Sequence, residues 1–228
     1  MNSNEPTAED FKQLMKDVKE LSVRLKERLN IVGNGEKKTL VLLLGPTGSG
    51  KTTLFHELIN KHLNVIDGNY GPELEATEII EDFKIGHTMI AETSFPGLYY
   101  DDQIDVIYCD CPGFFDNRGE IQDIINSFAI YLLSTFTPKI KILLFSSVPD
   151  IKAGRGRNLM NNIKMIQNII RDEHSIESNL AFIITKINAS QATNIIENLP
   201  QNSIFSKIEQ QNHIFTFPIP NNNSVGQR

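Results

Sequence analysis

Eight consecutive residues have the types and spacing that phosphate binding requires. The segment GPTGSGKT fits the pattern G-x-x-x-x-G-K-[ST] in full. Its glycines permit a tight turn whose backbone N–H groups point the same way, and a helix that begins there adds partial positive charge. The lysine supplies a point charge for the β- and γ-phosphates, and the threonine hydroxyl that follows it is placed to ligate Mg²⁺. The residues predicted to bind nucleotide are Gly45, Pro46, Thr47, Gly48, Ser49, Gly50, Lys51, Thr52 and Thr53.

A second motif suited to this chemistry ends a later strand. The stretch DVIYCDCPGFFDNRG is apolar up to Asp110 and then turns at Pro112-Gly113. A carboxylate at a strand end beside a phosphate loop can hold a magnesium-bound water, and the Gly113 N–H can bind the γ-phosphate. Asp-x-Pro-Gly is also a common turn. Together with the first motif, however, it predicts that Asp110 and Gly113 belong to a nucleotide site.

The two motifs together resemble the translation-factor-related class of P-loop GTPases. Within that class the chain looks most like the septin, chloroplast-import-receptor and immunity-associated (AIG-type) group, where D-T-P-G-F-F-D is familiar; DCPGFFD here has Cys111 in place of threonine. The resemblance covers residues 38–220. It implies that Lys51, Thr52, Asp110 and Gly113 act on the phosphates, with Lys51, Thr52 and Gly113 as the catalytic set. It also implies slow or dimer-dependent GTP hydrolysis.

The residue after Gly113 departs from Ras-like members of the class. Those members have a glutamine there that orients the attacking water, whereas this chain has Phe114. Another group must then position water if hydrolysis occurs. The candidates are Asp116, Arg118, Glu120 or a residue of a partner.

The motif expected to read the base departs as well. Such GTPases carry [NT]-K-x-D, whose aspartate accepts two hydrogen bonds from guanine, but this chain has Thr185-Lys186-Ile187-Asn188. Asn188 offers one acceptor and one donor, and a mispaired buried donor costs about 1–3 kcal/mol. The predicted nucleotide contacts therefore include Thr185, Lys186 and Asn188, with guanine selectivity left open. An ordinary strand-to-loop turn is the alternative.

In the GTPase class that this chain resembles, a threonine in the segment before the second strand closes on Mg²⁺ when triphosphate is bound. The first choice for this role is Thr77 in ELEATEII, and the second is Thr93 in AETSFPG. The predicted magnesium ligands are thus Thr52, Asp110 and Thr77.

Composition limits the other functions. The chain has 228 residues and a net charge of −6, from 22 Lys+Arg and 28 Asp+Glu. A general attraction to nucleic acid is therefore not expected. No apolar run reaches the length of a membrane span, and no secretory signal is recognised at the N-terminus. The chain is expected to be cytoplasmic, with Cys109 and Cys111 as reduced thiols.

Strands alternate with helices along most of the chain. TLVLLL (39–44) before the phosphate motif reads as a buried strand, and TTLFHELI (52–59) after it reads as a helix. The later alternation predicts an α/β, three-layer P-loop fold with a mainly parallel sheet and helices on both faces. Residues 64–77 and the Tyr99–Asp102 segment are expected to be loops, and a hairpin is expected around Gly86-His87.

The expected domains are a disordered start with an amphipathic helix (1–36), the P-loop domain (37–220) and a tail (221–228). The helix spans residues 10–29, with apolar residues spaced by three and four. It packs on its own domain or pairs with a helix of a partner or second copy.

These features favour a Mg²⁺-dependent, GTP/GDP-binding switch or assembly protein with slow hydrolysis, read out by a homodimer or an effector protein. The alternatives are an ATP-binding P-loop protein, motivated by Asn188, and a non-hydrolysing assembly module, motivated by Phe114.

Overall fold

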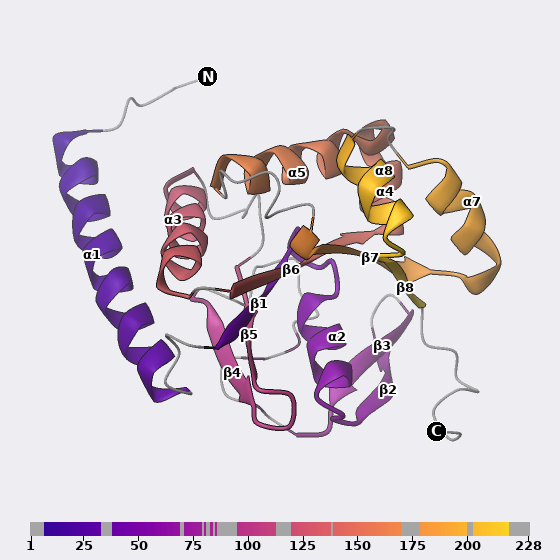
Figure 1. Ribbon diagram of the computed structural model, residues 1–228, viewed down its shortest axis with the longest axis horizontal. Coiled ribbons are helices and arrows are strands. Elements are labelled where there is room, and N and C mark those ends of the chain that lie inside the picture. Colours follow the sequence, from indigo (N-terminus) through magenta and orange to yellow (C-terminus); the bar gives the residue numbers. More distant parts are fainter. Residues whose placement is uncertain are drawn as a thin grey trace.

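A six-stranded, mainly parallel sheet forms the centre of the computed structural model (Figure 1). In sheet order its strands are β4 (Gly97–Asp101), β5 (Val106–Asp110), β1 (Thr39–Leu44), β6 (Lys139–Ser147), β7 (Leu180–Ile187) and β8 (Ile214–Pro218). Only the β4–β5 pair within this sheet is antiparallel. The structure describes residues 7–32, 38–68, 71–78, 80, 83, 85, 95–112, 120–137, 139–169, 178–199 and 203–218.

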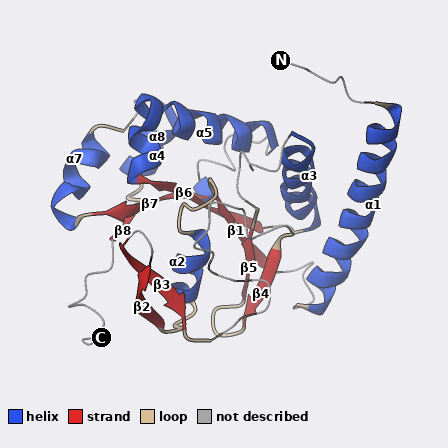
Figure 2. Ribbon diagram, turned by 180° about the vertical axis from the view of Figure 1, so that it is seen from behind, coloured by secondary structure: helices blue, strands red, loops and turns tan. Residues whose placement is uncertain are grey.

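Helices cover both faces of this sheet. One face carries α3 (Glu120–Phe136), α5 (Arg157–Ile169) and α8 (Ser203–Gln210); the other carries α2 (Lys51–Leu58) and a separate hairpin of β2 (Leu63–Gly68) and β3 (Gly71–Ala76) (Figures 1 and 2). The short elements are α4 (Val148–Lys152), η2 (Ala153–Gly156), η3 (Ala189–Gln191) and α7 (Ala192–Glu197). The α/β, mainly parallel fold predicted from the sequence is confirmed.

Each face of the sheet has its own apolar core, and β1 contributes to both. Leu40, Leu42 and Leu44 belong to the larger cluster, which also holds buried residues of α1 (Ala8–Ile31), α3, α5 and α8. Val41 and Leu43 belong to a smaller cluster with Phe55, Phe83, Tyr108, Phe145 and Ile183. Because both faces are covered, β1 is an unbroken apolar run without polar alternation.

The N-terminal helix α1 lies beside α3, at the edge of the sheet that β4 forms (Figure 1). It begins at Ala8 in a capping box, in which the Thr7 and Asp10 side chains each bond to the other's backbone N–H. Leu21, Leu25 and Leu29 are buried, so this helix packs on its own domain over its C-terminal half. None of the helices in the described ranges has the length and apolarity needed to cross a membrane.

Two segments expected to be loops are strands. Residues 63–68 and 71–76 pair as the antiparallel strands β2 and β3, in which Leu63, Val65 and Leu74 stand next to polar residues and Gly68 pairs with Gly71. The Tyr99–Asp102 segment forms most of β4, whose Leu98 packs into the larger core. The hairpin predicted around Gly86-His87 lies outside the described residues.

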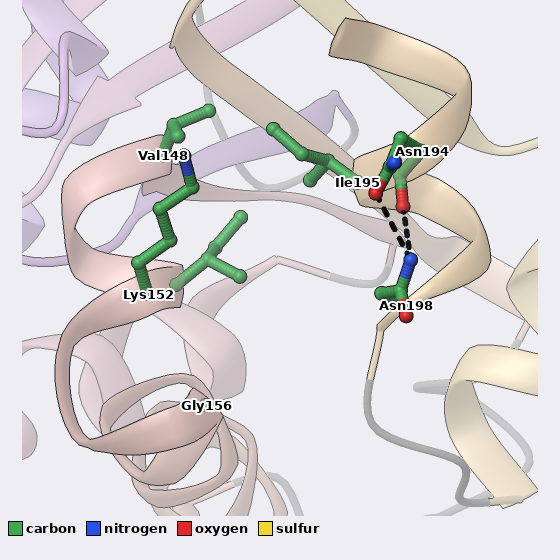
Figure 3. A pocket seen from close by; sticks show the side chains of 7 residues that line it. Val148, Lys152, Gly156, Asn194, Ile195 and Asn198 are labelled. Atoms are coloured by element: carbon green, nitrogen blue, oxygen red, sulfur yellow. Dashed lines mark hydrogen bonds between the residues drawn. The ribbon is translucent and has the colours of Figure 1, made fainter.

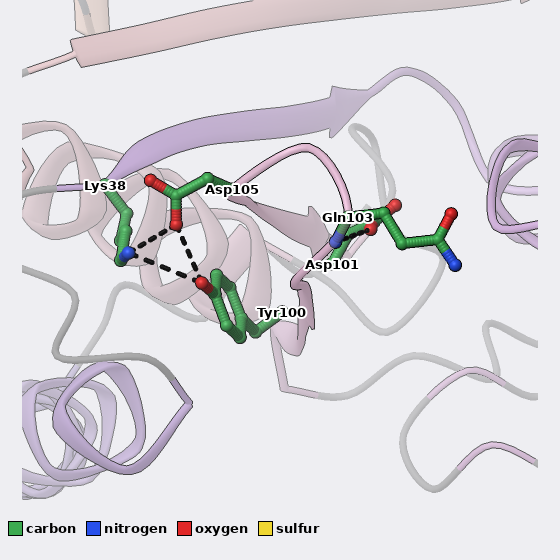
Figure 4. Close-up of polar contacts among 5 residues, drawn as sticks. All are labelled: Lys38, Tyr100, Asp101, Gln103 and Asp105. Carbon is green, nitrogen blue, oxygen red and sulfur yellow. Dashed lines mark hydrogen bonds and ion pairs between the residues drawn. The ribbon is translucent and has the colours of Figure 1, made fainter.

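At the amino end of β1, three polar side chains tie the sheet together (Figure 4). Lys38 forms an ion pair with Asp105, which precedes β5, and its ammonium also donates to the Tyr100 hydroxyl at 3.4 Å. That hydroxyl donates to Asp105 at 2.7 Å. This cluster, called the Lys38 clamp below, joins β1 to the β4–β5 hairpin.

Candidate functional site

The predicted phosphate loop (residues 45–52) connects the carboxyl end of β1 to α2. In the sheet, β1 lies between β5 and β6. The next strands of this sheet along the chain, β4 and β5, lie on one side of β1, and the strand after them, β6, lies on the other side. Such a switch point is where open α/β sheets bind ligands. Gly50 caps α2 with a φ of 87°, and Lys51 is the first helical residue. The start of α2 and its N–H groups therefore border the loop.

Close packing underneath fixes the path of this loop. Gly45 has a φ of 149°, and a Cβ placed on it would lie 2.5 Å from the Phe145 carbonyl oxygen of β6. Neither this φ nor this contact accommodates a side chain. Glycine is thus required here because the loop lies against β6.

The Lys51 side chain folds back over the loop and is 7% exposed. Its ammonium donates to the carbonyl oxygens of Gly45 at 3.1 Å and Pro46 at 3.0 Å. Burial lowers the pKa of Lys51, and the nearby Asp110 carboxyl opposes this effect. Among the described residues, this buried ammonium bonds only to carbonyl oxygens, and the Asp110 carboxylate lies near it without bonding to it. Such an arrangement favours the approach of an anion.

The structure brings Thr52 and Asp110 together, as the two motifs predict. The Thr52 hydroxyl donates to Asp110 Oδ2 at 2.5 Å, and Asp110 is fully buried at the end of β5. Burial raises the pKa of the Asp110 carboxyl, while Lys51 and the Thr52 hydrogen bond act the other way. The other oxygen, Asp110 Oδ1, is buried and has no hydrogen-bond partner in the described part of the chain.

These two side chains fit a magnesium ion bound together with phosphates. Mg²⁺ prefers oxygen ligands and takes one or two from the protein, filling its other positions with water and phosphate. The Thr52 hydroxyl and the unpartnered Asp110 oxygen match that donor set. The described residues contain no group of three or more His, Cys, Asp or Glu side chains that could hold a metal ion.

Thr185 connects the expected base-reading segment to the phosphate loop. Its hydroxyl donates to the Ser49 carbonyl oxygen at 2.7 Å, and its methyl carbon lies 3.5 Å from the Cβ position of Gly50. Thr185 is buried at the carboxyl end of β7. The predicted phosphate and base segments are therefore neighbours in space, although 136 residues separate Ser49 from Thr185.

Two further residues of that segment, on either side of the buried Ile187, face solvent. Lys186 is exposed and has a φ of 53°, at an irregularity in the β7–β8 pairing. Asn188 is also exposed, and its carbonyl oxygen accepts from the Gln191 N–H at 2.9 Å. Both side chains lie at the same edge of the sheet as the phosphate loop, since β1 and β7 run parallel. A role for Lys186 and Asn188 in base binding stays a prediction.

Thr77 lies apart from Thr52 and Asp110. It is exposed, and its hydroxyl donates to the His62 carbonyl oxygen at 2.8 Å, beyond the end of α2. Thr52 lies in the first turn of this eight-residue helix, which is about 12 Å long. A role for Thr77 in metal binding stays a prediction. Five residues of the predicted site lie outside the described residues: Gly113, Phe114, Thr93, Asp116 and Arg118. Glu120 is described only as the first residue of α3, without its side chain.

No role is assigned to His56 from the sequence. His56 is fully buried, one helical turn after Thr52, and bonds to the Phe83 carbonyl oxygen. His56 follows Thr52, a predicted metal ligand, by four residues, and this helical spacing was the signal in the sequence that the two side chains are neighbours.

A cavity of about 360 Å³ lies between α4 and α7 (Figure 3). Val148 and Ile151 of α4 line one side of it, and Ile195 of α7 lines the other side, where the Asn198 amide bonds to Asn194. No residue of the phosphate loop lines this cavity. It is therefore separate from the candidate site.

Comparisons with known proteins give weak likenesses. No family model and no curated protein matches the chain. Among solved structures, it is similar to a variant of SsGBP, with 12% identity, a TM-score of 0.40 and coverage of 91% of this chain and 57% of that one. It is also similar to nucleolar GTP-binding protein 1 from Plasmodium falciparum (14%, 0.34, 80% and 77%). A third is the signal recognition particle receptor SRb-GTP/SRX complex from Chaetomium thermophilum (15%, 0.36, 80% and 89%).

The chain thus spans little more than half the length of the SsGBP structure, and all three TM-scores are too low to carry an argument. The class is defined by the chain's own features: a parallel sheet with β1 at its switch point, a glycine-rich loop into a helix, and a lysine and threonine at the helix start. These features define an α/β P-loop domain.

Proposed function

We propose that this chain is a Mg²⁺-dependent guanine-nucleotide-binding switch or assembly protein that hydrolyses GTP slowly. The observation that carries the proposal is the arrangement of Lys51, Thr52 and Asp110. A buried ammonium and a hydroxyl–carboxylate pair meet at the start of a helix, on a loop shaped by glycine. This combination suits a polyphosphate bound with a divalent cation.

The chain's own residues divide the work in this proposal. The backbone N–H groups of the phosphate loop hold the β-phosphate, and the Lys51 ammonium leaves its two carbonyl partners for the β- and γ-oxygens. Thr52 and Asp110 hold the magnesium ion and its water, and Gly113 contacts the γ-phosphate. Bound magnesium neutralises charge on the phosphates. Thr185 keeps the base segment against the phosphate loop, where Lys186 stacks on the purine and Asn188 contacts its edge.

Hydrolysis is expected to be slow, because Phe114 occupies the position from which a glutamine orients water in Ras-like proteins. A phosphate-release assay under single-turnover conditions checks this. Turnover well below one per minute fits the proposal, and rapid turnover by the isolated chain contradicts it. GTP and GDP are then the states that a second copy or an effector protein distinguishes.

A second candidate is an ATP-binding or non-selective P-loop module, and Asn188 is the observation that favours it. A competition titration against a fluorescent GTP analogue, with Mg²⁺ present, compares GTP, ATP and xanthosine triphosphate. We expect GTP to bind at least about tenfold more tightly than either competitor. If ATP or xanthosine triphosphate competes equally well, the guanine assignment is wrong and only the phosphate site remains.

The Asn188→Asp variant sharpens this titration. A second acceptor toward guanine is expected to strengthen GTP binding about tenfold, since a mispaired buried donor costs about 1–3 kcal/mol. No gain for GTP contradicts the placement of Asn188 at the base.

A further inference from the structure

His56 makes a buried contact between α2 and Phe83, which lies in the chain between β3 and β4. Its Nε2 lies 2.9 Å from the Phe83 carbonyl oxygen, and because a carbonyl only accepts, Nε2 donates. The Phe83 ring stacks on Phe55, the residue before His56, with ring centroids 3.9 Å apart. Two further contacts, Thr77 with the His62 carbonyl and Lys61 with Glu78, also join the end of α2 to the chain after β3, but both are exposed.

An apolar residue would fill this position at lower cost. Nε2 makes this bond, but the other ring nitrogen, Nδ1, is buried without a hydrogen-bond partner among the described residues. Such a group costs about 1–3 kcal/mol. A histidine that served only to pack edge-on against Phe55 would carry this cost without a return, so its polar contact to Phe83 is the feature that needs a role.

The contact lies next to the Thr52–Asp110 pair. His56 follows Thr52 by four residues, which places both on one side of α2. Phe83 packs with Val41, Leu43 and Tyr108, on the face of the sheet that also carries Asp110, because Tyr108 and Asp110 are two residues apart on β5.

We propose that His56 is a positioning residue for the magnesium site. Its hydrogen bond to the Phe83 carbonyl holds Phe83 against α2, and this contact keeps Thr52 and Asp110 in the geometry that binds metal. The proposal rests on the proposed function, since it assumes that this pair ligates magnesium. His56 itself contacts neither nucleotide nor metal. It acts as outer partners of metal ligands do, whose loss commonly lowers metal affinity about 10–100-fold.

Three variants separate the hydrogen bond from the packing. His56→Gln carries an amide N–H at about the reach of Nε2 and can still donate to Phe83. His56→Leu fills similar volume without a donor, and His56→Asn is polar but too short to reach. Thermal unfolding selects the variants that are folded, and His56→Asn replaces His56→Leu if the latter does not fold.

The measurement is the affinity of each variant for GTP, first in EDTA and then with Mg²⁺. We expect equal affinities in EDTA for all variants, because the phosphate loop is unchanged. The gain on adding Mg²⁺ is expected to match wild type in His56→Gln and to fall about tenfold or more in His56→Leu or His56→Asn.

Equal Mg²⁺-dependent gains in wild type, His56→Leu and His56→Asn overturn the positioning role and leave the proposed function intact. A similar loss in His56→Gln also overturns it, since the hydrogen bond is then not the cause. If wild type binds no GTP with or without Mg²⁺, the proposed function is wrong and the positioning role falls with it.

Discussion

The two ends of β1 each carry a lysine, and the two lysines are placed in opposite ways. At the amino end, the hydrogen bonds of Lys38 to Asp105 and Tyr100 raise the pKa of its ammonium. At the carboxyl end, burial lowers the pKa of Lys51, whose hydrogen-bond partners are the carbonyl oxygens of Gly45 and Pro46. The Lys38 ammonium is paired with a carboxylate at the surface, whereas the Lys51 ammonium is buried and has no bonded counter-ion within the described ranges.

This difference separates a structural role from a functional one. Each side chain of the Lys38 clamp has a hydrogen-bond partner within the cluster, and the cluster joins β1 to the β4–β5 hairpin. The Lys38 clamp therefore stabilises the native state. Lys51 and Asp110 are charged groups whose burial opposes their ionisation. Sites that are strained in the free protein are where proteins commonly give up stability for ligand binding. The comparison predicts that changes at the two ends affect different properties.

The largest effect is expected from Lys51→Ala, compared with Lys38→Ala. Lys51→Ala should weaken GTP binding at least about 100-fold, since each lost charge-assisted hydrogen bond costs about 1.5–3 kcal/mol. Its nucleotide-free form should be no less stable than wild type. Lys38→Ala should bind GTP as wild type does but unfold at a lower temperature. Titration calorimetry and thermal unfolding check both, and equal binding losses in the two variants contradict the comparison.

The next effect concerns the path of the phosphate loop. Gly45→Ala places a Cβ at 2.5 Å from the Phe145 carbonyl, whereas Gly48→Ala meets nothing within 4 Å. Both variants have a positive φ, which costs about 1–2 kcal/mol for a side chain. Gly45→Ala should therefore cost more stability than Gly48→Ala in urea unfolding. The reverse order indicates that β6 does not constrain the loop as described.

A pH effect of intermediate size is expected from Asp110. The pKa of the Asp110 carboxyl is raised in the native state, whereas in the unfolded state it lies at its ordinary value of 3.8. Between these two pKa values the native state keeps a proton that the unfolded state has lost. Stability therefore falls as pH rises from 3.8 through the native pKa. In Asp110→Asn this contribution is absent. The stability of Asp110→Asn relative to wild type should increase over that window and then level off; a constant difference at every pH contradicts a raised pKa.

The smallest effect is expected from Tyr100→Phe in the Lys38 clamp. Removing the hydroxyl takes away its hydrogen bond to Asp105 and the long one it accepts from Lys38, but leaves the Lys38–Asp105 ion pair. The unfolding temperature should fall by no more than about 3 °C, with GTP affinity unchanged. A change in nucleotide binding means that the two ends of β1 are not independent.

Much of the fold and of the phosphate site follows from local sequence. The apolar run before Gly45 and the helix after it depend on neighbours in the chain, and so does the Thr52 position at the start of α2. The meeting of Thr52 with Asp110 was predicted because strands that end at the same edge of a parallel sheet bring their last residues together.

Other features depend on contacts that sequence patterns do not encode. The β2–β3 hairpin was read as a loop because its glycines and proline resemble turn signals, and cross-strand pairing decides its structure. The bond from Thr185 to Ser49 and the bond from His56 to Phe83 join residues far apart in the chain. Thr77 was chosen by its place in the sequence order alone, and tertiary contacts place it against His62.

The most direct test of the central claim is calorimetric titration of the nucleotide-free chain with GTP, with Mg²⁺ and then with excess EDTA. If Lys51, Thr52 and Asp110 form a site for a magnesium-bound triphosphate, GTP should bind at a single site with Mg²⁺ and clearly more weakly in EDTA. Absence of binding, or binding of equal strength in Mg²⁺ and EDTA, contradicts the assignment of Thr52 and Asp110 to the metal.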